Sequence, residues 1–75
     1  MPRLPSLTAR KMIRALKRAG FVEDRQKGSH LILIHHKTKV RTVVPIHKGK
    51  TIKPSLVYAI ISDADLTIDE FIKLL

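Results

Sequence analysis

Apolar residues recur along this chain at two different spacings, and the change of spacing separates helices from strands. From residue 9 to residue 19 they follow the helical spacing i, i+3, i+4, i+7 and i+10. The positions concerned are Ala9, Met12, Ile13, Leu16 and Ala19. Thr8 is expected to cap the start of this helix, because its hydroxyl can accept a hydrogen bond from a free amide of the first turn. Gly20 is expected to close the helix.

Three short runs with strand character follow this helix. We expect strands at residues 21–26, 30–36 and 41–47. The middle run is apolar on both of its faces from Leu31 to Ile34, which predicts a central strand. Pro45 cannot donate a ladder hydrogen bond, so the third strand is placed at an edge of the sheet.

The register between the second and third strands stays open. Their connection, Lys37 to Lys39, contains no Gly or Asn, so turn chemistry does not fix it. Two pairings fit the pattern, one in which His30 faces Ile46 and one in which His30 faces His47. A slip of one residue exchanges the two faces of a strand, so the choice decides whether the two histidines meet.

The last third of the chain is predicted to contain two helices. The first begins at Pro54 or Ser55 and is expected to pack across the sheet through Leu56, Val57, Tyr58, Ile60 and Ile61. The second is short, begins with a capping box from Thr67 to Glu70, and has its apolar face at Ile68, Phe71, Ile72 and Leu75. The order helix, three strands, helix, short helix predicts one α+β domain over residues 1–75, with a three-stranded antiparallel sheet and the helices on one face. This is the arrangement of double-stranded-RNA-binding domains.

Charge then points to the class of partner. The formal net charge is +9, and 14 of the 15 Lys and Arg residues lie in residues 1–53, which makes the first two-thirds of the chain a surface for a polyanion. The predicted first helix carries a cationic face opposite its apolar one, formed by Arg10, Arg14, Lys17 and Arg18 with Lys11 at its margin. Such a face suits a phosphate backbone. Recognition by aromatic stacking is disfavoured, because the chain has only three Phe, Tyr or Trp residues, Phe21, Tyr58 and Phe71.

Other classes are disfavoured by composition. The chain has no cysteine, so neither disulfides nor a thiolate zinc site can stabilise it, whereas a second copy or a bound partner protein could. No apolar run is long enough to span a bilayer and no apolar signal core follows the basic N-terminus, so we expect a cytoplasmic protein with no membrane partner.

The best candidate for chemistry is the segment Lys27-Gly28-Ser29-His30. Here a short polar turn with a flexible glycine leads straight into an apolar strand, so that an imidazole stands where a rigid element leaves a loop. A second loop, Lys48-Gly49-Lys50-Thr51, lacks the glycine spacing of a nucleotide-binding P-loop. Contact of Lys48 and Lys50 with a nucleic-acid backbone is the better interpretation.

Five segments together resemble the HicA family of bacterial and archaeal toxins. They are Arg18-Ala19-Gly20-Phe21, Lys27-Gly28-Ser29-His30, Val44-Pro45-Ile46-His47, Ile52-Lys53-Pro54 and Asp69-Glu70-Phe71-Ile72-Lys73-Leu74-Leu75. The resemblance implies a ribosome-independent mRNA interferase with the fold above, held inactive by a HicB antitoxin, and it places the active-site histidine at His30. The chain departs from the family pattern at Lys11, where many members have Glu, and at the basic turn Lys37 to Lys39.

The implied chemistry can be stated for these residues. A neutral His30 imidazole can accept the proton of a ribose 2′-hydroxyl, whose oxygen then attacks the adjacent phosphorus and leaves a 2′,3′-cyclic phosphate. Charge on the phosphoryl oxygens can be stabilised by Lys27, Arg25 or Lys48. His47 is the candidate general acid, with His35 or His36 as substitutes. Gly28 would let the backbone approach the substrate, and Ser29 could orient a histidine or contact phosphate.

Three alternatives remain at this point. Metal-dependent cleavage is disfavoured, because His35 and His36 point to opposite faces and the acids are scattered, so we expect no metal and no cofactor. A non-catalytic RNA-binding module would use the same cations without chemistry at His30. A subunit that acts through a protein partner would use the apolar sheet face that the helices leave uncovered, and under the toxin interpretation that face would bind an acidic HicB surface.

Overall fold

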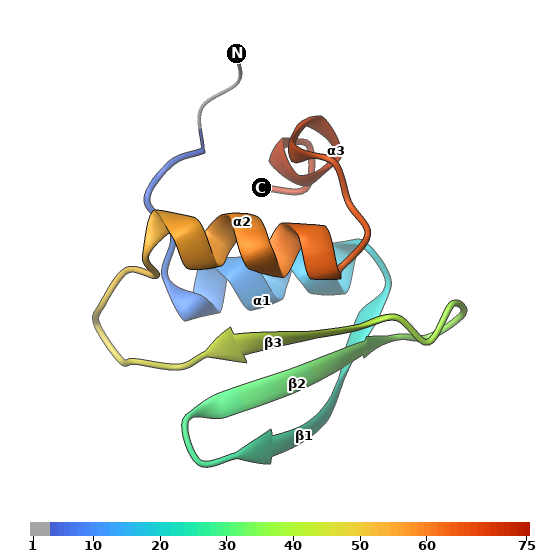
Figure 1. The fold of residues 1–75 in the computed structure, drawn as a ribbon, viewed down its shortest axis with the longest axis horizontal. Coiled ribbons are helices and arrows are strands. Elements are labelled where there is room, and N and C mark those ends of the chain that lie inside the picture. The colour runs from blue at the N-terminus through green and yellow to red at the C-terminus, as the bar shows by residue number, and fades with distance from the viewer. Residues whose placement is uncertain (1–3) are drawn as a thin grey trace.

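The computed structural model describes residues 4–75 as three helices and one three-stranded sheet. The elements are, in order, α1 (Ala9–Arg18), β1 (Phe21–Lys27), β2 (His30–His35), β3 (Arg41–Pro45), α2 (Pro54–Asp63) and α3 (Ile68–Ile72). The sheet is antiparallel in the order β1-β2-β3, and α1 and α2 lie side by side on one of its faces (Figure 1). The predicted α+β fold with a central β2 is confirmed.

Helix α1 begins where the sequence predicts and ends at Arg18, with Ala19 rather than Gly20 as its C-cap. The Thr8 hydroxyl accepts a hydrogen bond from the Lys11 amide at 3.3 Å. After the last helical residues, Gly20 has a φ of +105°, a value at which an L side chain is strained. The helix buries Ala9, Met12, Ala15 and Leu16, while Ile13 and Ala19 are half-buried.

Alternate residues of the sheet form the floor of the core. Leu31, Leu33 and Val44 are buried beneath the helices, together with Thr42, whose hydroxyl donates to the carbonyl oxygen of Ile60 in α2 at 3.1 Å. The buried residues of α2 are Val57, Ile60 and Ile61. A buried threonine with its hydrogen bond made therefore ties α2 to β3.

The predicted packing of α2 is wrong at two positions. Leu56 and Tyr58 are 44% and 48% exposed and do not pack across the sheet. One residue turns a helix by about 100°, so the neighbours of the buried Val57 on either side are carried away from the core. A single stripe of α2 covers the sheet.

The register between β2 and β3 differs from both predicted pairings. His30 pairs with Pro45, and Ile32 pairs with Val43, so His30 faces neither Ile46 nor His47. The cause lies at the far end of the hairpin, where the His35 ring accepts hydrogen bonds from the backbone amides of Lys37 and Thr38. This side-chain contact, and not a glycine, sets the length of the loop.

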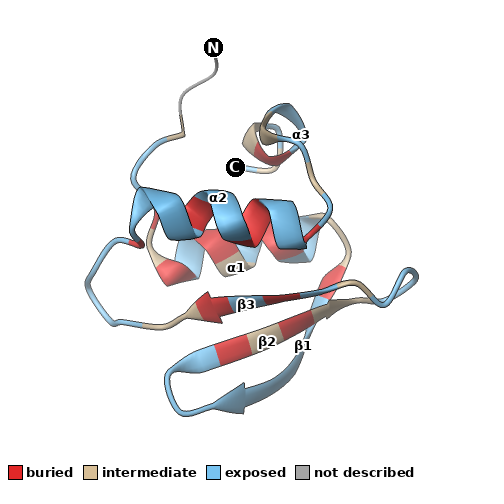
Figure 2. Ribbon diagram, in the orientation of Figure 1, coloured by how far each residue is buried: buried red, intermediate tan, exposed pale blue. Residues whose placement is uncertain are grey.

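Strand β1 is the exposed edge of the sheet. Phe21 is buried at its start, and every later residue is exposed (Figure 2). A bulge lies between Glu23 and Arg25, so Asp24 has no partner on β2. Because a bulge twists an edge and interrupts its hydrogen-bonding row, it discourages pairing with another strand.

Helix α3 closes the structure over α2. The capping box is confirmed: the Glu70 amide donates to the Thr67 hydroxyl at 3.1 Å, and the Thr67 amide donates to the Glu70 carboxylate at 2.8 Å. Of its predicted apolar face only Phe71 is fully buried; Ile68 and Ile72 are half-buried, and Leu75 is 43% exposed.

Candidate active site

The turn between β1 and β2 is a two-residue hairpin built around Gly28. Its φ is +56° and no atom lies within 4 Å of the position that a Cβ would take. A positive φ at the first central residue is what a type II′ hairpin turn requires. The amide of the Gln26 side chain donates to the Gly28 carbonyl at 3.0 Å, which braces the turn. The turn is thus held in shape while its tip stays open to a substrate.

His30 is the first residue of β2 and is exposed. It pairs with Lys27 on β1 and with Pro45 on β3. Because Leu31 is buried under the helices, alternation places His30 on the opposite, outer face of the sheet. The imidazole therefore stands on a rigid strand, open to solvent, with a cation as its cross-strand neighbour.

His47 lies beyond the end of β3 and is also exposed. The Ile46 amide donates to the Ser29 carbonyl at 2.6 Å, so the β3 backbone continues alongside the β1–β2 turn after the last paired residue. His47 is therefore placed one step past this contact, near the turn but not opposite His30. The structure brings both histidines to the same end of the molecule.

His35 and His36, the substitutes considered for the general acid, lie at the other end. Five residues of strand separate His30 from His35, or about 16 Å. His35 is committed to structure: its Nε2 lies 3.1 Å from the Ala19 carbonyl oxygen, and its Nδ1 accepts from two backbone amides. His36 stacks on the His35 ring with a centroid separation of 4.9 Å. Neither residue can serve chemistry at His30.

Cations from α1 line a groove that leads toward the turn. The groove has a volume of about 410 Å³, and its walls include Arg10, Arg14 and Lys17. Its apolar floor is formed by Ile13 and Ile46, and Ile46 is the residue bonded to Ser29. Three of the predicted RNA-binding residues thus meet on one surface, which at Ile46 lies one residue before His47. Sequence reasoning missed Ile46, although alternation from Pro45 would have placed it on the inner face.

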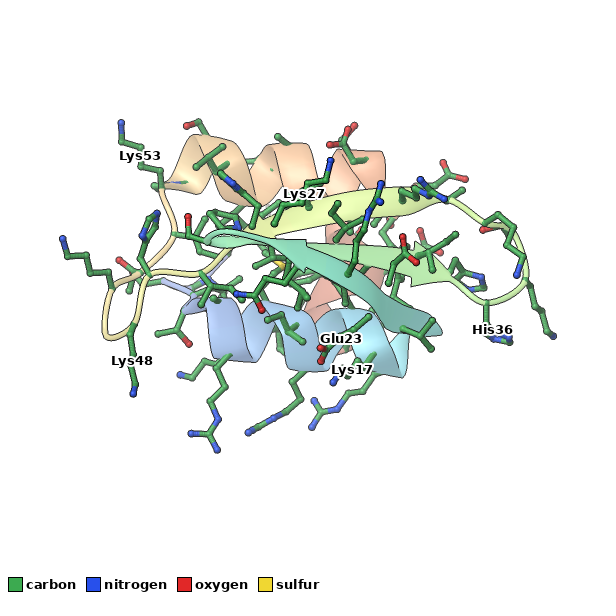
Figure 3. The ribbon with its side chains drawn as sticks, turned by 90° about the horizontal axis from the view of Figure 1, so that it is seen from below. Lys17, Glu23, Lys27, His36, Lys48 and Lys53 are labelled. Carbon is green, nitrogen blue, oxygen red and sulfur yellow. The ribbon has the colours of Figure 1, made fainter. Side chains whose placement is uncertain are left out.

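One of these cations already has a partner. Lys17 Nζ lies 2.7 Å from Glu23 Oε2, with both side chains half-exposed (Figure 3). Arg18, at the end of the same helix, donates to the Leu74 carbonyl at 2.7 Å. Arg10 and Arg14 are therefore the cations of α1 that are better placed for a phosphate.

The remaining predicted contacts lie on the β1–β2 turn and on the loop after β3. Lys27 ends β1, and Gly28 and Ser29 form the tip of the turn. Lys48 and Lys50 are exposed on the second loop, which is anchored to the start of α1 because the Ile52 amide donates to the Leu7 carbonyl at 2.7 Å. Lys48 and Lys53 lie at one end of the molecule and His36 at the other (Figure 3). Both basic loops therefore flank the same end of the sheet.

Metal sites and membrane-spanning helices are the other features considered. Among residues 4–75, no group of three or more His, Asp or Glu side chains is arranged to hold a metal ion. None of the helices described is both long enough and apolar enough to cross a membrane.

Comparison with known families decides the broad class. The family model for the HicA toxin of bacterial toxin-antitoxin systems matches residues 9–66. The chain belongs to this family. No curated protein matches it. The matched region runs from α1 to the residues after α2 and contains His30, His47 and both basic loops.

Membership of the HicA toxin family assigns a toxin of a toxin–antitoxin system. Family members are RNase-type toxins, which makes this chain a nuclease at that general level, with RNA as target and an antitoxin as partner. The helix α3 lies outside the matched residues. In this chain α3 contacts α2, and Leu74, which follows α3, accepts a hydrogen bond from Arg18 of α1.

Proposed function

We propose that the chain is a metal-independent endoribonuclease that cleaves mRNA, with His30 as general base and His47 as general acid. The observation that carries the proposal is the position of His30. It is exposed at the first position of a rigid strand, beside Lys27, at the end of the molecule where the α1 groove and both basic loops meet. A base placed in this way can reach a ribose held by its phosphates.

The observed register is compatible with two histidines acting on one phosphate. Directly paired residues have Cβ atoms only about 5 Å apart, which leaves little room for a phosphate between two rings. His30 pairs with Pro45 instead, and His47 lies beyond it. In the proposed reaction His30 takes the 2′-hydroxyl proton, the 2′-oxygen bonds to phosphorus, and the 5′-oxygen leaves with a proton from His47. The products are a 2′,3′-cyclic phosphate and a 5′-hydroxyl.

The cations have separate roles in this proposal. Lys27 and Arg25 on β1, with Lys48 on the loop after β3, stabilise negative charge on the phosphoryl oxygens. Arg10, Arg14 and Lys17 in the α1 groove, together with Lys48 and Lys50, hold the phosphates that flank the cut. Gly28 keeps the tip of the turn free of a side chain, so that the backbone and Ser29 can approach the RNA.

We test this with end-labelled RNA in the presence of EDTA. The wild type should cut and leave cyclic-phosphate ends, while His30→Ala should bind the RNA but not cut it. His47→Ala should slow cutting less for substrates with a good leaving group, because such a group needs no proton. Binding by both proteins with cutting by neither would favour a non-catalytic RNA-binding module. Loss of cutting in EDTA and its return with Mg²⁺ or Mn²⁺ would contradict metal independence.

Neutralisation by a HicB-like antitoxin is proposed to occur on the outer face of the sheet. This face is apolar in its centre and bears cations at its margin. The apolar residues are Val22, Ile32, Ile34 and Val43, and the cations are Arg25, Lys27 and Arg41. Since His30 lies on the same face, an acidic antitoxin seated there would cover the base.

This proposal predicts a specific loss of binding. Val43 is 42% exposed on the outer face, and Tyr58 is 48% exposed on α2. Val43→Asp should weaken binding of a HicB-like antitoxin, because it introduces a charge into the apolar centre, whereas Tyr58→Asp should not. Equal binding by both variants would contradict the placement. A homodimer through the same face would appear as dissociation of the wild-type dimer by Val43→Asp in sedimentation.

A further inference from the structure

A cavity beside His47 is lined in part by Ile52, Lys53 and Leu56, to which the proposed reaction gives no role. It lies between the end of β3 and the start of α2, with a volume of about 230 Å³. Its polar wall carries His47, Lys50 and Lys53, and its apolar wall carries Pro45, Ile52 and Leu56. Pro45 is also the β3 partner of His30. The cavity therefore begins at the residue that pairs with the candidate base, His30.

We infer that this cavity binds the nucleotide on the 3′ side of the cut, with its base against Leu56 and its 3′ phosphate on Lys53 and Lys50. The inference rests on the proposed function, because it takes its direction from His47. A general acid must lie next to the leaving 5′-oxygen, and that oxygen belongs to the nucleotide that follows the cut. The residues around His47 are then the surroundings of that nucleotide.

The size of the cavity suits a single base. Pockets for drug-sized ligands measure about 300–1,000 Å³, and this cavity is smaller. Ile52 is buried at its floor, while Leu56 is 44% exposed at its rim. The Leu56 side chain does not pack in the core, so a flat base that packs against it would remove its apolar surface from water.

The charge of the cavity suits a phosphate. Lys50 and Lys53 are both exposed, and residues 25–62 contain no Asp or Glu that could neutralise them along the chain. The loop is fixed at both ends, by the Ile46–Ser29 contact at 2.6 Å and the Ile52–Leu7 contact at 2.7 Å. The two ammonium groups are therefore presented from a braced loop beside an apolar surface, which is the combination that a nucleotide requires.

Dinucleotides provide the test, because each contains only one bond that can be cut. We would measure kcat/KM for the sixteen ribodinucleotides with and without a 3′-terminal phosphate. The phosphate should raise the wild-type value about fivefold, and Lys53→Gln should lower this ratio toward one, with Lys50 left as the remaining cation. Lys37→Gln, which removes an exposed cation from the β2–β3 loop, should leave the ratio at its wild-type value. A ratio unchanged by Lys53→Gln, or changed equally by Lys37→Gln, would overturn the inference.

The apolar wall is tested with an abasic nucleotide on the 3′ side of the cut. Removal of the base should raise KM for the wild type but much less for Leu56→Ala. Tyr58→Ala is the matched control, since Tyr58 is equally exposed on α2 but does not line the cavity. An equal base dependence in wild type and Leu56→Ala would overturn the assignment of Leu56. Circular dichroism would verify that each variant is folded.

The inference can fail separately from the proposed function. If the wild type cuts RNA but the ratios do not respond to Lys53→Gln, the assignment of the cavity as a nucleotide subsite is wrong, while the proposed ribonuclease activity stands. If the wild type does not cut, a dinucleotide with 2′-deoxyribose at the cut and a 3′ phosphate is titrated while amide shifts are recorded. Changes concentrated in residues 45–56 would support the subsite without any catalysis. Changes there only on addition of an antitoxin would identify a protein-binding cavity and overturn it.

Discussion

Replacing His35 with alanine should destabilise the fold and spare the chemistry. The His35 ring makes three contacts with backbone groups, at 3.1, 3.1 and 3.2 Å. A neutral ring protonated at Nε2 satisfies all three, because Nε2 then donates to Ala19 while Nδ1 accepts from Lys37 and Thr38. The ring also meets Phe21 edge-on at 5.3 Å between centroids.

The magnitude follows from these contacts. A net protein hydrogen bond contributes about 0.5–1.5 kcal/mol, and the exposed amides of Lys37 and Thr38 can recover water, so these bonds count at the low end. The aromatic pair adds about 0.5–1.5 kcal/mol. We expect His35→Ala to cost about 2–4 kcal/mol. A domain of this size has about 4–11 kcal/mol of stability in all, so the loss is large.

The assay is urea unfolding followed by circular dichroism, with RNA cutting measured at low temperature where the variant is folded. His36→Ala is the control, since His36 is exposed and loses only a stacked neighbour. It should cost less than about 0.5 kcal/mol. A His35→Ala protein of wild-type stability that cannot cut RNA would refute the reasoning, because His35 would then have a role in the reaction and not in the fold.

Three further predictions concern the fold. Gly20→Ala should cost about 2–4 kcal/mol, because its φ is +105° and its Cβ would lie 2.6 Å from His35 Nε2; an unchanged melting temperature would contradict this. Thr42→Val should cost only about 1 kcal/mol, since Ile60 O keeps its bond from Ala64 at 3.0 Å, and a loss as large as that of Thr42→Ala would show that the hydroxyl matters more. Hydrogen bonds from the Thr67 backbone and then from its side chain hold the pKa of Glu70 below 4.5, so its stabilisation is complete above pH 4.5 and is lost as the pH falls through the lower folded value. In Glu70→Gln the melting temperature should no longer show this decrease at low pH. The same decrease in the variant and the wild type would contradict the prediction.

Local patterns were enough to predict most of the fold. The helical spacing from Ala9 to Leu16, the Thr8 cap and the Thr67–Glu70 capping box each depend on residues within one or two turns. The candidate turn Lys27–His30 was visible for the same reason, because its glycine and its strand are adjacent in the sequence.

The register of β3 could not be predicted, because it depends on contacts between distant residues. Glycine is the usual signal for a left-handed turn residue, yet here Lys39 adopts a φ of 64°. The loop is held by the His35 ring, which in turn is held by the carbonyl of Ala19, 16 positions earlier. No local rule contains that contact, and the relation between His30 and His47 depends on it. The exposure of Leu56 was missed because a nearly continuous apolar run does not show which stripe faces the sheet.

The measurement that tests the central claim most directly is the single-turnover rate of RNA cutting in EDTA by the wild type and His30→Ala. A general base accounts for about 10²- to 10⁴-fold of a rate, so we expect a loss of that size with RNA affinity and melting temperature unchanged. Cyclic-phosphate ends should appear with the wild type. Equal rates for the two proteins would contradict the account, because His30 would then be only an exposed residue at the start of a strand.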